Sequence, residues 1–299
     1  MGISIKDVTV SSLSPMMQHY VKTKEEYSDC ILFYRLGDFY EMFFEDAQTV
    51  SRELELTLTG KDCGMEERAP MCGVPFHAAE VYINRLISKG YKVAVCEQVE
   101  DPKQAKGIVK REVIRVVTPG TTLNTQALDE TKNNYIMSVV YLSNRFGIAI
   151  ADVTTGDFMV TEVENIRKLS DEIYKFSPAE LLCNEAFCMC GADMDELRNR
   201  LNISITTLEN WYFDDELCAR TLKEHFHVGT LEGLGLKDYA CAVIAAGALF
   251  SYLLETQKTS LEHMRAITPY ITDKYMLIDS STRRNLELTE TMREKGKRG

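Results

Sequence analysis

The sequence predicts an α/β protein of two domains, each with a mixed sheet, and three observations support this. With 299 residues, the chain is about twice the length of a typical domain. Its first part alternates short apolar runs with amphipathic segments, as strands and helices that share one core do. Its second part begins with three successive strand-like runs and then alternates helical and strand patterns.

The first predicted domain covers residues 1–118. A helix is expected from Ser14-Pro15 to about Ser28, because a capping hydroxyl followed by proline is a strong helix start. The polar residues 60–70 predict a loop. Apolar spacing predicts the other elements: strands at 30–35, 39–44, 56–59, 91–99 and 112–118, and helices at 45–54 and 77–89.

The second predicted domain covers residues 132–258 and follows a linker, 119–131, that is rich in turn-forming and polar residues. Three runs separated by short turn signals indicate an antiparallel meander. Three hairpin strands followed by alternating elements favour a ribonuclease H-like sheet. The predicted elements are strands at 135–142, 146–153, 157–163, 179–183 and 203–208, and helices at 165–175, 193–201, 213–225 and 238–256. Residues 259–299 are expected to begin a further domain that is cut off.

The charge balance restricts how the chain could contact nucleic acid. It holds 45 acidic and 34 basic residues, a net charge of −11. A protein that encloses nucleic acid through charge alone is basic, so any DNA contact must be local. The most basic stretch is 103–115, with five basic residues and one acid. A solvated surface is the plain alternative for that stretch.

Cysteine usage and hydropathy indicate a cytoplasmic protein. The nine cysteines include no C-x-x-C pair, which favours reduced thiols. Cys183, Cys188 and Cys190 lie close in sequence, but no second pair or nearby histidine supports a zinc site. The N-terminus lacks the pattern of a signal peptide. The longest uncharged run, 239–254, is short for a membrane span and predicts a buried helix.

One segment, residues 32–43, carries an unusual pattern. If 39–43 is extended, Phe39 and Glu41 share one face and Tyr40 and Met42 the other. A glutamate beside a phenylalanine is unusual in a core, because a buried carboxylate needs a partner. One alternative is structural: Phe39 belongs to the core, and Glu41 pairs with a base such as Arg35.

This segment resembles the Phe-x-Glu mismatch-recognition motif of the bacterial MutS mismatch repair family. Further blocks resemble the same family in the same order, over essentially the whole chain. These blocks are Ser14-Pro-Met-Met17, Phe33-Tyr-Arg35, Gly37-Asp-Phe-Tyr-Glu41, Gly73-Val-Pro-Phe-His77, Cys96-Glu-Gln98, Asp101-Pro102, Val117-Thr-Pro-Gly-Thr121, Pro178-Ala-Glu-Leu181 and Thr282-Arg-Arg-Asn-Leu286.

The resemblance implies a role for each part of the chain. Residues 1–118 would be the mismatch-recognition domain, 132–258 the connector domain, and 259–299 the start of the core domain. Phe39 would enter the minor groove of mismatched duplex DNA as a wedge, and Glu41 would hydrogen-bond the same base. Basic residues near the wedge are candidates for contacts to the DNA backbone. They are Lys61, His77, Lys106, Lys110 and Arg111.

The resemblance also implies partners and a cofactor for a longer parent protein. That parent would be a homodimeric ATPase that uses ATP and Mg²⁺ and docks a MutL protein. The chain contains no G-x-x-x-x-G-K-[ST] loop to hold ATP phosphates. We therefore expect an N-terminal fragment that binds DNA, has no cofactor of its own and is not an enzyme.

A metal-dependent nuclease is the alternative function, because ribonuclease H-like folds can hold carboxylates for two metal ions. Asp152 and Asp157 lie near predicted strand ends and could be ligands. The further acidic ligands that such a site needs do not occur at convincing positions.

Overall fold

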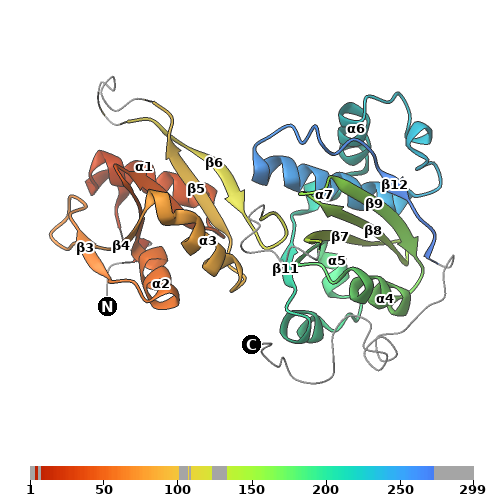
Figure 1. The fold of residues 1–299 in the computed structure, drawn as a ribbon, viewed down its shortest axis with the longest axis horizontal. Coiled ribbons are helices and arrows are strands. Elements are labelled where there is room, and N and C mark those ends of the chain that lie inside the picture. Colours follow the sequence, from red (N-terminus) through yellow and green to blue (C-terminus); the bar gives the residue numbers. More distant parts are fainter. Residues whose placement is uncertain (1–3, 6–7, 101–106, 108, 123–132, 273–299) are drawn as a thin grey trace, which may run out of the picture. The chain divides into compact units, whose positions relative to one another are not determined.

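The computed structural model describes residues 4–5, 8–100, 107, 109–122 and 133–272. The chain forms two compact units (Figure 1). The first comprises Met1–Lys132 with Leu253–Ser260, and the second Asn133–Tyr252 with Leu261–Gly299. Each unit contains a six-stranded mixed sheet with helices packed on it, which confirms the predicted fold class.

The sheet of the first unit is built around a hairpin. β1 (Ile31–Leu36) and β2 (Phe39–Phe43) pair antiparallel through the turn Gly37-Asp38. Gly37 has a φ of +58°, a conformation that glycine adopts without steric cost. The other strands are β3 (Thr59–Lys61), β4 (Ala69–Pro75), β5 (Val93–Gln98) and β6 (Arg111–Val117), and the order across the sheet is β3-β4-β2-β1-β5-β6. Neighbouring strands are antiparallel except β1 and β5.

Helices cover both faces of this sheet. α1 (Pro15–Glu26) packs on one face, and α2 (Phe44–Leu54) and α3 (Ala79–Ile87) pack on the other. The alternation predicted for β2 is present: Tyr40 and Met42 belong to the core under α2 and α3, and Phe43 belongs to the core under α1.

Two sequence predictions in this unit are wrong. The strand expected at 56–59 begins only at Thr59, and β4 starts within the expected loop 60–70. Proline and glycine disfavour strands in sequence-based reasoning, and β4 contains Pro70, Gly73 and Pro75. Pairing with β2 on one side and β3 on the other overrides that preference.

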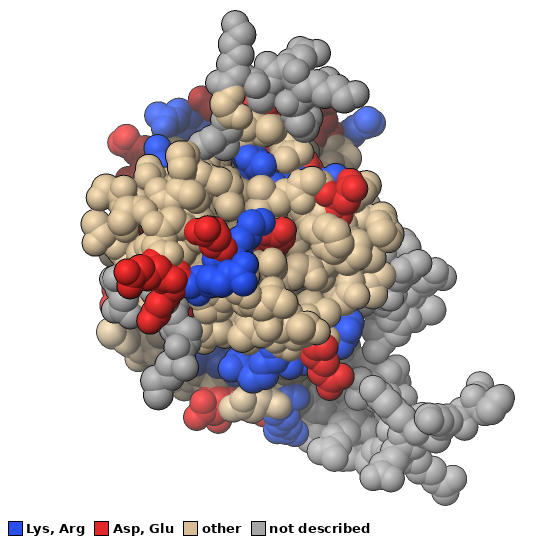
Figure 2. Space-filling view, turned by 90° about the vertical axis from the view of Figure 1, so that its left-hand side faces the viewer, with Lys and Arg blue, Asp and Glu red and all other residues tan. Residues whose placement is uncertain are grey.

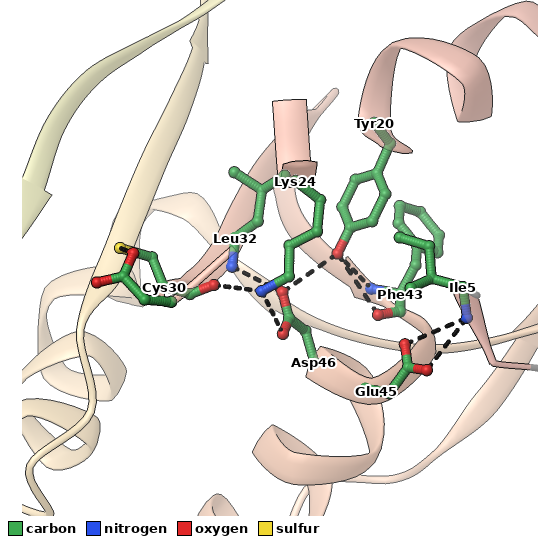
Figure 3. Close-up of polar contacts among 9 residues, drawn as sticks. Ile5, Tyr20, Lys24, Cys30, Leu32, Phe43, Glu45 and Asp46 are labelled. Atoms are coloured by element: carbon green, nitrogen blue, oxygen red, sulfur yellow. Dashed lines mark hydrogen bonds and ion pairs between the residues drawn. The ribbon is translucent and has the colours of Figure 1, made fainter. Parts of the chain in front are cut away.

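A buried carboxylate ties the elements around β2 together (Figure 3). Asp46 of α2 is 8% exposed and accepts a hydrogen bond of 2.9 Å from the Leu32 backbone N–H. Its other oxygen lies 3.0 Å from Lys24 Nζ of α1. Tyr20 contacts the same carboxylate, and its hydroxyl oxygen also accepts from the Phe43 N–H at 3.2 Å. Burial raises the pKa of Asp46, and Lys24 opposes that shift.

The sheet of the second unit begins with the predicted antiparallel meander. It is formed by β7 (Tyr135–Leu142), β8 (Arg145–Asp152) and β9 (Asp157–Val163). β10 (Glu180–Cys183) lies parallel to β7, β11 (Ser204–Thr207) parallel to β10, and the short β12 (Thr268–Pro269) parallel to β9. The order β11-β10-β7-β8-β9 is the ribonuclease H-like arrangement that the sequence predicts.

Helices also lie on both faces of the second sheet (Figure 1). α4 (Ile166–Phe176) and α5 (Glu185–Cys188) cover one face, and α7 (Ala240–Gln257), with α6 (Asp215–His225) beside it, covers the other. A Cβ at Gly147 would lie 2.1 Å from the Cys241 carbonyl oxygen, so α7 approaches the sheet where a side chain is missing.

Two helix predictions in this unit have clear outcomes. By length and composition α7 could cross a membrane, but 72% of its apolar window is buried, as predicted for a core helix. The helix expected at 193–201 is present over residues 194–200, and its last part, Glu196–Arg200, is π-helical.

We expect Asp46→Ala to lower the free energy of unfolding by about 3 kcal/mol, because it leaves the Leu32 N–H without its acceptor and the Lys24 ammonium without its counter-charge. Urea unfolding followed by far-UV circular dichroism measures this change. Asp29→Ala is the matched control, because its ion pair with Lys92 is largely exposed on the Asp29 side and such pairs contribute about 0–1 kcal/mol. Equal losses in the two variants would contradict a structural role for the Asp46 network.

Candidate nucleic-acid interface

Phe39 lies on the surface at the tip of the β1–β2 hairpin. It is the first residue after the Gly37-Asp38 turn, pairs with Leu36 on β1 and with Pro75 on β4, and is 45% exposed. The alternative that Phe39 belongs to the core is therefore excluded. The ring belongs to strand β2, whose residues Tyr40 and Met42 are buried, so the strand that carries Phe39 is anchored in the core.

Glu41 forms an ion pair with a basic residue, but that residue is Lys61 and not Arg35, which the structural alternative named. Glu41 Oε2 lies 2.5 Å from Lys61 Nζ of β3. Arg35 instead contacts Glu97 at 3.4 Å. The Arg35 guanidinium also stacks 3.9 Å from the centre of the exposed Phe76 ring.

Gly73 of β4 lies next to the two candidate residues. It is opposite Glu41 in the antiparallel register. A Cβ at this position would lie 3.5 Å from Glu41 Cγ and 3.8 Å from Phe39 Cδ1, and 3.3 Å from the Tyr40 carbonyl oxygen. Phe39 and Glu41 thus flank a strip of bare backbone. Sequence reasoning identified Gly73 only as the first residue of a family-like block and did not place it beside Phe39 and Glu41.

The five candidates for contacts to the DNA backbone differ in their surroundings. Lys61 is paired with Glu41. His77 is exposed, with its ring edge-on to Phe76. Lys110 is also exposed, and it pairs with Glu112 at 2.6 Å. Lys106 lies outside the described residues.

Arg111 differs from the other candidates because it is buried. It is 7% exposed and donates to the carbonyl oxygens of Arg35 and Val109. Its guanidinium lies 5.2 Å from the centre of the Tyr34 ring. With its donors used inside the domain, Arg111 is better placed to support the sheet than to contact a phosphate.

A small buried polar cluster supports the β1–β2 hairpin from the α1 face. Tyr34 is opposite Glu41 in the register, and its hydroxyl lies 2.9 Å from His19 Nδ1. Burial raises the pKa of Tyr34 to about 12. Burial and the nearby Arg111 charge lower the pKa of His19. Sequence reasoning did not identify His19 or Tyr34, since no spacing pattern links residues from a helix and a strand.

Most of the face seen in Figure 2 is uncharged, and the Lys and Arg side chains near its centre lie beside Asp and Glu side chains. The net charge of −11 predicts a local rather than an enveloping DNA contact. The mixed surface is consistent with that expectation.

The nuclease alternative gains no support from the carboxylates of the second unit. Asp152 and Asp157 are opposite each other on β8 and β9. Asp152, however, is fully buried and accepts hydrogen bonds from Thr154 and Thr155 in the turn after β8 and from the Asn134 N–H just before β7. In the part of the chain that the structure describes, no group of three or more His, Cys, Asp or Glu side chains could hold a metal ion, and the three clustered cysteines are free thiols.

Comparisons with known proteins agree with this architecture. Residues 14–126 match the family model for MutS domain I, and residues 134–265 match that for MutS domain II. The DNA mismatch repair protein MutS of Lachnoclostridium phytofermentans is 67% identical over 290 residues, which are 97% of this chain and 31% of that protein. The MutS proteins of Acetivibrio thermocellus and Ruminiclostridium cellulolyticum are 53% and 54% identical, each over 97% of this chain and 33% of their own length.

The fold and the site therefore define a class of protein. It is an α/β protein of two units that carries an exposed phenylalanine, Phe39, at a hairpin tip, with a glutamate, Glu41, on the same strand face and paired to a lysine. The chain belongs to the MutS family and contains its domains I and II. It spans about a third of the length of the curated relatives it matches.

We expect the stability of the chain to depend on pH through His19. The folded state holds the pKa of His19 below the ordinary value of 6.5, so the unfolded state binds the proton more readily. The free energy of unfolding should rise with pH through the region just below 6.5 and level off above it. Urea unfolding at several pH values should show this slope weakened in His19→Gln and retained in His77→Gln, whose ring is exposed. Identical slopes in wild type and His19→Gln would refute the assignment.

Proposed function

We propose that this chain recognises mispaired or unpaired bases in duplex DNA and thereby serves the first step of DNA mismatch repair. The observation that carries the proposal is the exposure of Phe39 at the tip of a rigid hairpin, with Glu41 on the same face. The names of the relatives, DNA mismatch repair protein MutS, support the same conclusion.

The mechanism is a test of deformability. Stacking of Phe39 on a base would contribute about 1–3 kcal/mol. Inserting the ring unstacks a base step and kinks the duplex, which costs a few kcal/mol. A mispaired or bulged step is already weakly stacked, so the kink costs less there than in a matched duplex. Such a wedge detects errors in any sequence context, because it reads no base edge.

Glu41 has a different role in this mechanism. A carboxylate near phosphates lowers affinity for any duplex, so its value lies in discrimination. Placed beside the wedge, Glu41 can form one hydrogen bond with the base that Phe39 stacks on. Exposed basic residues at the rim, His77 and Lys110 among them, would hold the backbone without reading sequence.

The longer relatives suggest further proposals. We propose that the parent of these domains works in the cytoplasm as a homodimeric, ATP- and Mg²⁺-dependent protein that docks a MutL protein. We also propose that this chain itself acts as a binding module and not as an enzyme, because its sequence contains no G-x-x-x-x-G-K-[ST] loop to hold ATP phosphates.

We expect Phe39→Ala to reduce the preference for mismatched over matched duplex about tenfold, because the stacking energy is lost. Fluorescence anisotropy at low ionic strength, with duplexes that differ in a single mispair, measures the two affinities. Trp211→Ala is the matched control, because Trp211 is an aromatic residue of the second unit with the same exposed fraction, 45%. A Phe39→Ala chain that keeps the wild-type preference would refute the wedge.

We expect Glu41→Gln to bind duplex DNA as tightly as wild type or more tightly, because it removes a negative charge that faces phosphates. The same change should reduce the preference for mismatched duplex, since Gln offers a different hydrogen-bond pattern to the base. The anisotropy assay measures both effects. Unchanged discrimination would remove Glu41 from the mechanism.

A further inference from the structure

We infer that Lys61 is a positioning residue for Glu41: its ammonium group holds the Glu41 carboxylate beside Phe39 and so sets the selectivity for mismatched DNA. The inference rests on the proposed function and deepens it. It changes the role of Lys61 from a contact with the DNA backbone to a contact that acts through Glu41.

The path of the Lys61 side chain supports this role. Lys61 starts on β3 at the edge of the sheet, where it pairs with Ala69 of β4. Its Nζ lies 5.7 Å from the centre of the Phe43 ring and ends 2.5 Å from Glu41 Oε2. The side chain therefore extends over the sheet on the Phe39 face to reach a carboxylate on β2, two strands away.

The surroundings of the pair make the contact effective. The Lys61 side chain is 31% exposed and that of Glu41 is 16% exposed, so water screens the pair less than an ion pair on the open surface. Gly73, opposite Glu41, leaves the strip between Phe39 and Glu41 without a side chain. Lys61 thus holds the Glu41 carboxylate from the β3 side. The backbone of β4 at Gly73 lies directly beside Glu41.

The pairing has an electrostatic consequence for DNA binding. A lone carboxylate at this surface would repel phosphates, whereas the Glu41–Lys61 pair carries no net charge. The ammonium therefore lets an acidic residue approach a duplex in a fixed position. A lysine engaged in this way does not serve as an independent phosphate contact.

The ratio of affinities for mismatched and matched duplex separates the two roles of Lys61. If Lys61 positions Glu41, Lys61→Met lowers that ratio about threefold, the effect of a displaced hydrogen bond. Lys61→Arg should restore the ratio, since a guanidinium also holds a carboxylate. In the Glu41→Gln background, Lys61→Met should leave the ratio unchanged, because the group it positions is gone. A phosphate contact alone would lower both affinities equally in either background.

Fluorescence anisotropy titrations at low ionic strength measure the affinities of the 299-residue chain and its variants for matched and mismatched duplexes. Lys110→Met is the matched control: Lys110 is also paired with a glutamate in the same unit, and its loss should weaken both duplexes without changing the ratio. A ratio unchanged by Lys61→Met, or reduced equally in both Glu41 backgrounds, would overturn the inference. Phe39→Ala in the same series tests the proposed function separately: if it lowers the ratio while Lys61→Met does not, only the role of Lys61 is refuted.

Discussion

The anchoring of strand β2 is the constraint on which the rest of this site depends. A side chain can separate stacked nucleobases only if the strand that carries it does not move. Asp46, buried under α1 and α2, accepts from the Leu32 backbone and from Lys24, and Tyr20 links the same cluster to the backbone of Phe43. These contacts fix β2 at its buried end. The turn at Gly37-Asp38 then carries Phe39, at the other end, out of the core.

The proposed function also requires an acidic protein to contact DNA. The net charge of −11 opposes any broad association with a polyanion. At the site itself, the carboxylate of Glu41 is paired with Lys61, so these two residues together add no net charge beside Phe39. In the proposed mechanism, binding would gain little from phosphate attraction. It would depend on how easily the duplex deforms, and this is the property that differs between matched and mismatched DNA.

Much of the fold followed from local patterns. The three strands of the meander and the helix at Ala240–Gln257 were predicted nearly to the residue, because their periodicity is long and uninterrupted. The strand Ala69–Pro75 was not, since Pro70, Gly73 and Pro75 hide it from any propensity argument. The helix predicted at 193–201 is present over residues 194–200, but the sequence did not predict that Glu196–Arg200 would be π-helical. For the strand Ala69–Pro75, pairing with β2 and β3 decided the outcome.

The sequence by itself determined that Phe39 and Glu41 share a face, because alternation along a strand depends only on backbone geometry. It could not determine which face is open to solvent. The tertiary structure decided that: α1 covers Phe43 but leaves Phe39 exposed. It also decided that Glu41 meets Lys61 and not Arg35, and that Arg111 is buried. Ion pairs between strands depend on sheet order, and the order β3-β4-β2-β1 is set by contacts among residues far apart in the chain.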